Sequence, residues 1–307
     1  MGPSIVGLRP AKNRVDPRRP YAFHVERERA ACGAVVDVAT IFLTNRECPW
    51  RCLMCDLWKN TTDQSVPVGA LPEQIDFALS RLPAARHVKL YNSGNFFDAA
   101  AVPPADHPAI ADRVRHFERV VVENHPKLCG EACVRFRDLL GKPLEVAMGL
   151  ETIHPEVLPR LNKQMTLDDF SRAADFLRNH EINIRAFILL RPPFLDERSG
   201  LEWAVRSVGW AFQRGVECCA IIPTRGGNGI MDQLHAAGEF APPALPSLER
   251  SLAEGLALNQ GRVLVDLWDI ERLFDCPTCS PARADRLSRM NLSQTIEPPV
   301  TCERCDG

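Results

Sequence analysis

The stretch Ile41–Trp58 reads IFLTNRECPWRCLMCDLW and holds three cysteines within eight residues, Cys48, Cys52 and Cys55. Their spacing is C-x3-C-x2-C, and no fourth cysteine lies near them. Thiolates are soft ligands that suit zinc and iron–sulfur clusters. A structural zinc ion normally takes four protein ligands, and a four-iron cubane usually takes four cysteines. Three thiolates in one loop therefore favour a [4Fe-4S] cubane with one iron left open to a ligand or substrate. The alternative is a zinc-bound loop that takes its fourth ligand from elsewhere.

Short apolar runs rich in β-branched residues alternate with helical patterns along the chain. Each run is nearly continuous in hydrophobicity, as in strands buried on both faces. This alternation predicts βαβ units and a parallel sheet that curls into a partial or near-complete (β/α) barrel of the TIM type. Ligands of such barrels bind at the C-terminal ends of the strands, and the cysteine loop follows the first run. The runs are 35–44, 87–92, 119–124, 144–151, 182–190 and 216–223, with a possible seventh at 262–269.

Three segments are expected from the change in composition along the chain. Residues 1–34 read as an N-terminal extension, 35–269 as the core domain, and 270–307 as a small cysteine-rich appendage. The helical pattern TLDDFSRAADFLRNH within the core has Thr166 as its expected N-cap, with Asp169 three residues further on.

The bulk composition is that of a globular protein. Of the 307 residues, 45% are hydrophobic and 25% are charged. No apolar run reaches the length of a membrane span, and the first residues lack the apolar region of a secretory signal, so a cytoplasmic location is expected. The net charge of −2 argues against a broad basic surface for nucleic acid. Basic residues gather locally in the arm RPAKNRVDPRR (9–19) and at Arg283, Arg286 and Arg289.

The C-x3-C-x2-C loop after the first strand resembles the signature of radical S-adenosylmethionine (SAM) enzymes. The resemblance implies that Cys48, Cys52 and Cys55 ligate a [4Fe-4S] cluster whose open iron chelates SAM. It further implies an electron donor of the flavodoxin or ferredoxin type, because the cluster must be reduced before SAM is cleaved to methionine and a 5′-deoxyadenosyl radical. Met54, just before the third cysteine, would then lie near the adenine.

Further segments match the same family in order. YNSGNFFD stands where the family has a glycine-rich turn that binds the SAM amino group, so Asn92, Ser93 and Gly94 are candidates, although the more common form of that turn ends in Glu. Glu123 ends the third run, and Glu151 lies in MGLETIHPEVLPRLNKQ, which resembles the GLET…NK stretch of a branch related to archaeosine-biosynthesis and elongator-type proteins. Glu151 would lie near the SAM ribose, and IIPTRGGNG resembles the adenine-side turn. Either carboxylate could instead serve a helix N-terminus.

A second cysteine set lies near the end of the chain. Cys276 and Cys279 form C-x2-C, as do Cys302 and Cys305, with 22 residues between the pairs. Four thiolates complete a tetrahedral site, which favours structural zinc, with an auxiliary iron–sulfur cluster as the alternative. Either metal would fix a tail that is too small to fold by apolar burial alone.

Arg185 lies within the apolar run INIRAFILL, where a buried charge must find a partner. It would bind the SAM carboxylate or an anionic substrate, or else pair with a barrel carboxylate. Two substrate classes are open: a tRNA or modified base, with Arg283, Arg286, Arg289 and the basic arm contacting phosphates, or a small metabolite. The alternative to a radical SAM enzyme is a non-enzymatic, zinc-stabilised binding or scaffold protein.

Overall fold

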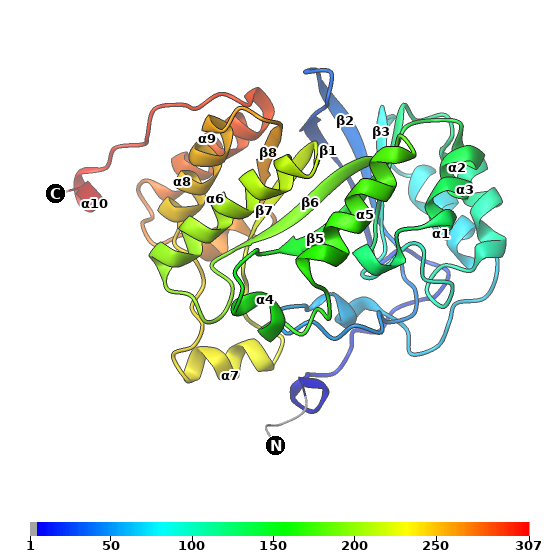
Figure 1. Ribbon diagram of the computed structural model, residues 1–307, viewed down its shortest axis with the longest axis horizontal. Coiled ribbons are helices and arrows are strands. Elements are labelled where there is room, and N and C mark those ends of the chain that lie inside the picture. Colours follow the sequence, from blue (N-terminus) through cyan, green and yellow to red (C-terminus); the bar gives the residue numbers. More distant parts are fainter. Residues whose placement is uncertain (1–4, 307) are drawn as a thin grey trace.

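The apolar runs form neighbouring strands of one curved sheet in the computed structural model, which describes residues 5–306 (Figure 1). The strands follow one another across the sheet in chain order, and from the second strand onward every pair is parallel. The expected α/β barrel architecture is confirmed. The parallel strands are β2 (Val35–Phe42), β3 (His87–Tyr91), β4 (Arg119–Glu123), β5 (Leu144–Glu151), β6 (Asn183–Leu190), β7 (Cys218–Pro223) and β8 (Arg262–Val265).

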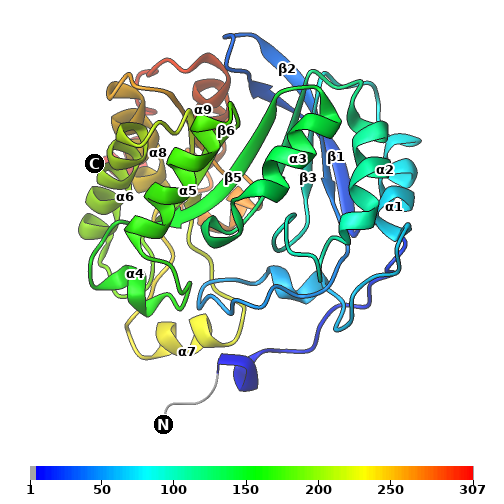
Figure 2. The same ribbon diagram turned by 45° about the vertical axis from the view of Figure 1, so that its right-hand side comes forward.

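Helices cover the outer face of the sheet (Figure 2). Successive strand residues point to opposite faces, so Val88 and Leu90 of β3 pack outward in the main hydrophobic core while Lys89 points into the barrel. The longer helices are α1 (Ala70–Leu79), α2 (His107–Val114), α3 (Glu131–Leu140), α5 (Leu167–Asn179), α6 (Glu197–Gln213), α8 (Leu245–Ala257) and α9 (Ser280–Ser293). Short helices are α4 (Val157–Arg160), α7 (Ile230–Ala236) and α10 (Glu303–Asp306), with 3₁₀ turns that include η1 (Ile5–Leu8), η2 (Leu57–Asn60) and η5 (Ile270–Leu273).

The N-terminus of α5 forms as its sequence predicts. The Thr166 hydroxyl accepts a hydrogen bond from the Asp169 backbone N–H at 3.1 Å, and the Asp169 carboxylate accepts one from the Thr166 N–H at 2.9 Å. This reciprocal capping box satisfies two backbone donors that the first helical turn leaves unpaired.

Residues 22–29, expected to lie in an extension, form a strand of the sheet. Strand β1 (Ala22–Arg29) pairs antiparallel with β2 over its whole length, so the segment boundary expected after residue 34 falls inside a β-hairpin. The inward side chains of β1 include Glu26 and Glu28, which pair with Lys89 at 2.8 and 2.6 Å. A strand with charged inward positions lacks the apolar pattern from which a buried strand is recognised.

The two edge strands of the sheet, β1 and β8, are bridged by side chains and by α9. Arg262 of β8 donates to the Arg29 backbone carbonyl at 3.0 Å, and the rings of His24 and Trp268 lie 5.7 Å apart. Helix α9 contacts both edge strands. Residues of the expected appendage therefore pack on the barrel rather than apart from it.

Ion pairs fill the N-terminal end of the barrel. Arg185 binds Glu28 and Glu145 at 2.6 Å each, and all three side chains are at most 10% exposed. Burial opposes these charges, but Arg185 and Lys89 outweigh it and hold the pKa of Glu28 well below its usual range. The salt-bridge alternative for Arg185 is therefore the one that the structure contains.

Among the described residues, every helix is too short or too polar to cross a lipid bilayer.

Candidate metal and cofactor site

The loop that carries Cys48, Cys52 and Cys55 lies across the C-terminal ends of the parallel strands, beside α4 and α7 (Figure 1). The segment that leaves α4 holds its middle, since the Leu161 carbonyl accepts from the Leu53 N–H at 2.8 Å. The loop therefore lies at the end of the barrel where such folds bind their ligands.

Asn228, at the turn before α7, holds the same loop from the other side. Its buried side-chain amide donates to the carbonyls of Leu53 at 2.9 Å and Cys55 at 3.1 Å, and its oxygen accepts from the Met231 N–H at 2.9 Å. The Asn228 amide nitrogen thus holds the cysteine loop, while its oxygen fixes the start of α7. This turn belongs to the IIPTRGGNG segment.

The basic N-terminal arm packs along the outside of the cysteine loop. Arg9 and Lys12 bind the Glu47 carboxylate at 2.6 and 2.8 Å, directly before Cys48. A Cβ at Gly229 would lie 1.9 Å from the Leu8 carbonyl oxygen, so only glycine lets the arm approach so closely there. These two cations hold the arm against the loop through Glu47, and contact of the arm with phosphates stays a prediction.

The three thiols of the loop are partly buried. The Asn95 amide donates to the Cys48 sulfur at 3.2 Å. Burial raises the pKa of Cys48 to about 11 and also raises the pKa of Cys52 and Cys55. Ligation of a metal therefore requires the loop to release protons.

The turn after β3 places its backbone around Glu123. The Glu123 carboxylate accepts from the N–H groups of Asn92 at 2.6 Å and Gly94 at 3.3 Å, and Ser93 between them has a φ of 51°. The Tyr21 hydroxyl, from the segment before β1, bonds the Ser93 hydroxyl at 2.8 Å. Burial outweighs these backbone hydrogen bonds and raises the pKa of Glu123 to about 7. The carboxylate thus organises the turn rather than a helix N-terminus.

Buried polar atoms without protein partners gather in this part of the site. Within residues 5–306, both side-chain polar atoms of Asn92 lack a partner, as do the Asn45 amide oxygen and the Thr44 hydroxyl. Buried polar groups nearly always have a hydrogen-bond partner, and an exception indicates a missing ligand or water. A Cβ at Gly94 would lie 3.6 Å from the Cys48 Cβ, so the turn adjoins the cysteine loop. These residues fit a polar ligand that reaches the cysteine loop.

A buried ion pair lies near the Cys52 thiol. Glu151, at a β-bulge with a φ of 64°, binds the Lys163 ammonium at 2.8 Å. Burial opposes the charge of Lys163, but Glu151 and the nearby Cys52 outweigh it and raise the lysine pKa. A Cβ at Gly149 would lie 2.1 Å from the Glu151 carboxylate and 2.5 Å from the ammonium. Because glycine has no side chain, Gly149 makes room for the Glu151–Lys163 ion pair.

Met54 lies half-buried among apolar residues of the loop and of the segments that follow β5, β6 and β7. It packs against two small apolar clusters, one around Met231 and Phe240 and one around Val157, Leu161 and Leu189.

The arginines expected to bind anions have carboxylate partners instead. Arg185 lies at the N-terminal end of the barrel, away from the cysteine loop. Arg283 and Arg286 bind Glu249 of α8 at 2.6 and 2.9 Å, and Arg289 binds Glu297 at 2.9 Å. The trio holds α9 against α8 and the returning tail, and its contact with phosphates stays a prediction.

Several residues of the site were not singled out by sequence reasoning. Lys163 is the lysine of the GLET…NK stretch, and Asn228 is the asparagine of the IIPTRGGNG segment. Both residues could therefore have been predicted from the motifs that contain them. Trp50 stacks on His125 with ring centroids 4.0 Å apart, and burial lowers the pKa of His125 to about 4. Nothing in the spacing of Tyr21, Trp50 and His125 marks them as neighbours.

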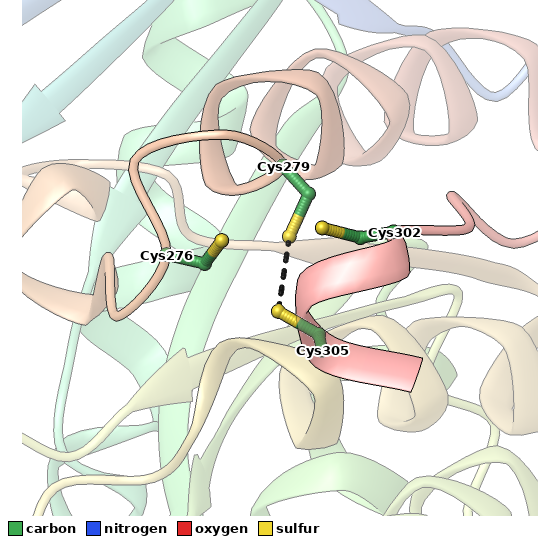
Figure 3. Close-up of side chains that lie close together, drawn as sticks. All are labelled: Cys276, Cys279, Cys302 and Cys305. Carbon is green, nitrogen blue, oxygen red and sulfur yellow. Dashed lines mark hydrogen bonds between the residues drawn. The ribbon is translucent and has the colours of Figure 1, made fainter. Parts of the chain in front are cut away.

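The four cysteines near the end of the chain meet in space. Cys276, Cys279, Cys302 and Cys305 bring their sulfurs within 4.8 Å of one another (Figure 3). Such a group can bind a metal.

No family model matches the chain. Curated relatives do. Archaeosine synthase subunit beta of Methanosarcina acetivorans is 26% identical over 284 residues, covering 85% of this chain and 80% of that protein. An uncharacterised protein of Methanocaldococcus jannaschii is 23% identical over an alignment of 312 residues, covering 94% and 85%. Archaeosine synthase subunit beta of Thermococcus kodakarensis is 32% identical over 127 residues, 39% of each chain.

Solved structures share the fold. Methylornithine synthase has a TM-score of 0.52 at 13% identity over 73% of this chain and 64% of its own, and Methanocaldococcus infernus Elp3 has 0.51 at 14% over 71% and 59%. The protein anSMEcpe, solved with bound AdoMet and a peptide, has 0.51 at 12% over 76% and 64%. The region matched by this chain covers less than two thirds of the length of each of these three structures. The expected resemblance is confirmed: the fold is that of radical SAM enzymes, and the sequence is similar to archaeosine synthase beta subunits.

Proposed function

We propose that this protein is a radical SAM enzyme in which Cys48, Cys52 and Cys55 hold a [4Fe-4S] cluster and SAM binds its open iron. One observation carries the proposal: a loop of three thiols is fixed across the barrel mouth beside the buried, unpartnered amide of Asn92. The fold shared with radical SAM enzymes supports it, and one of those structures, anSMEcpe, contains AdoMet.

When reduced by a flavodoxin- or ferredoxin-like donor, such a cluster supplies the electron that splits SAM into methionine and a 5′-deoxyadenosyl radical, which takes a hydrogen atom from the substrate. The residues of this chain bind and orient. The Asn92 amide would bond the amino-acid end of SAM, the Ser93–Gly94 backbone would line the same turn, and Glu123 would hold that turn in shape. Glu151, oriented by Lys163, would accept from the ribose hydroxyls, and Met54 would contact the adenine.

The proposed substrate class is a modified base, free or in tRNA. Its support is the similarity, over most of the chain, to a protein named archaeosine synthase subunit beta. A small metabolite is the rival class. A gel shift with tRNA that weakens as salt rises supports the first class, whereas deuterium transfer from a small metabolite to 5′-deoxyadenosine, with no tRNA binding, supports the second.

We place the reaction in the reducing cytoplasm, because cysteines clustered at short spacings favour metal sites over disulfides, and such sites persist where thiols stay reduced.

The decisive experiment is an anaerobic assay for 5′-deoxyadenosine after reconstitution with iron and sulfide and addition of SAM and a reductant. We expect brown protein that produces 5′-deoxyadenosine. Cys52→Ala should lose both the colour and the product, because it removes one of three ligands. Cys32→Ala is the matched control, since this exposed thiol lies in the turn between β1 and β2.

Production of 5′-deoxyadenosine by Cys52→Ala at the unaltered rate would show that the ligand assignment is wrong. Reconstituted protein that stays colourless and free of iron would contradict the function as a whole and would favour the binding or scaffold alternative.

A further inference from the structure

The second group of cysteines is assembled from two parts of the chain that are far apart in sequence. Cys276 and Cys279 lie between η5 and the start of α9, and Cys302 and Cys305 lie at α10. Figure 3 shows the four side chains pointing toward a common centre. Three of them are buried, and the Cys279 and Cys305 sulfurs are 3.7 Å apart. A disulfide would bring two sulfurs to about 2.0 Å, so the group is a set of four thiols.

The distances between these sulfurs distinguish the metals that four cysteines can bind. A tetrahedral ion with Zn–S bonds of about 2.3 Å holds its sulfurs about 3.8 Å apart. A cubane binds each cysteine through a different iron at a different corner, so its cysteine sulfurs must be farther apart than those around one shared ion. All four sulfurs here lie within 4.8 Å of one another. We propose that Cys276, Cys279, Cys302 and Cys305 form a tetrathiolate site for a single zinc ion.

The backbone around the first pair is shaped for a metal-bound thiolate. The N–H groups of Thr278 and Cys279 hydrogen-bond to the Cys276 sulfur, and the Ser280 N–H bonds the Cys276 carbonyl at 3.0 Å. The Arg283 guanidinium, one helical turn further on, contacts the Cys279 sulfur and also binds Glu249. Such hydrogen bonds and a nearby cation offset the negative charge of four thiolates and orient them.

The ion would close a loop around α9, with one cysteine pair at each end of that loop. Within it, the Asn291 and Gln294 side chains bond the peptide groups of Val265 and Val263 on the edge strand β8, each at 2.9 Å. Glu297 then ties the returning tail to α9 through Arg289. The site therefore holds the element that covers the free edge of the sheet. It lies on the outer flank of the helices, whereas the loop with Cys48 crosses the barrel mouth (Figure 1).

The test separates the two metal sites by removing one of them. The full-length triple variant C48A/C52A/C55A is purified without added metal and analysed for zinc, iron and acid-labile sulfide. We expect about one zinc per chain and neither iron nor sulfide above background. Cys302→Ser added to this variant should lose that zinc, whereas Cys32→Ala should keep it. Cobalt in place of zinc should give the visible bands of a tetrahedral tetrathiolate site.

Two outcomes would overturn the assignment. About four irons with sulfide in the triple variant would identify an auxiliary cluster instead. Triple-variant protein that binds neither zinc nor cobalt when titrated with them would leave four thiols without a metal role. If Cys302→Ser fails to fold, release of zinc from the triple variant by a thiol-modifying reagent, followed with a zinc-sensitive dye, gives the same stoichiometry. Because the triple variant lacks the cysteine loop ligands, failure of the proposed radical SAM activity would not change this result.

Discussion

Glu123 carries a carboxyl group into the barrel, where it meets the backbone of the Asn92–Gly94 turn. Its pKa of about 7 lies above the usual value of 4.5, because burial penalises the ionised form more than the backbone N–H groups favour it. Native protein therefore binds more protons at this group than unfolded protein does between pH 4.5 and 7. The free energy of unfolding should fall as pH rises through this window.

Glu123→Gln should remove this pH dependence, because glutamine keeps the shape of the neutral side chain and does not titrate. The raised pKa corresponds to about 3 kcal/mol, so the variant should gain up to that much over wild type at pH 8 and little at pH 4.5. Urea unfolding of metal-free protein at a series of pH values between 4.5 and 8 measures the free energy of unfolding of each variant. Glu202→Gln, at an exposed position, should keep the wild-type slope. Equal slopes for wild type and Glu123→Gln would contradict the assignment of the titrating group.

At the scale of residues, the sequence predicted what spacing and strand position determine. The cysteine triplet, Glu123 and Glu151 could be placed because side chains at the ends of neighbouring parallel strands meet at one edge. The pairing of Glu151 with Lys163 depends on a β-bulge and on the missing side chain of Gly149, which no periodicity reports. The partner of Arg185 could not be chosen in advance, because one of its two carboxylates lies on a strand that was not recognised.

Helix α9 protects the edge of the sheet by an exchange of amide hydrogen bonds. The Asn291 side chain both accepts from the Val265 N–H and donates to its carbonyl, as a neighbouring strand would. Exposed strand edges attract other strands, and proteins cover them with helices, loops or charges.

Asn291→Ala should destabilise the protein by about 1–3 kcal/mol, because it leaves the peptide groups of Val265 without their partners. It should also speed hydrogen–deuterium exchange at the Val265 amide. The exposed Ser288→Ala, on the same helix, is the control and should change stability by less than about 0.5 kcal/mol. Unaltered exchange at Val265 in Asn291→Ala would show that the helix does not protect the edge.

At the scale of elements, the seven parallel strands were predictable and β1 was not. The parallel strands bury apolar side chains outward against helices, so each appears as an apolar run. Strand β1 turns glutamates inward, where Lys89 and Arg185 from other strands neutralise them. Those partners are distant in sequence, so the local sequence of β1 predicts a charged extension and not a strand.

Buried ion pairs fill the N-terminal end of the barrel, and we call this cluster of Arg185, Glu28 and Glu145 the ion-paired floor. Arg185 connects Glu28 of β1 to Glu145 of β5 and so crosses the inside of the sheet. Desolvation makes such charges costly unless each keeps its partner.

Arg185→Met should lower the free energy of unfolding by about 3–5 kcal/mol, because it leaves two buried carboxylates without their shared cation. Chemical denaturation followed by circular dichroism measures the loss. Arg206→Met, which breaks an exposed pair with Glu202, should cost less than about 1 kcal/mol. Similar losses for the two variants would contradict the floor's role in stability.

The ion-paired floor also limits the end of the barrel at which a small molecule could enter. Arg185, Glu28 and Glu145 occupy the inside of the barrel at its N-terminal end, so in the proposed reaction the substrate and the products would enter and leave at the opposite end, beside the cysteine loop. A molecule bound deeper in the barrel would then have to bind before, and leave after, one bound nearer that end. A product that stayed bound would block the next substrate.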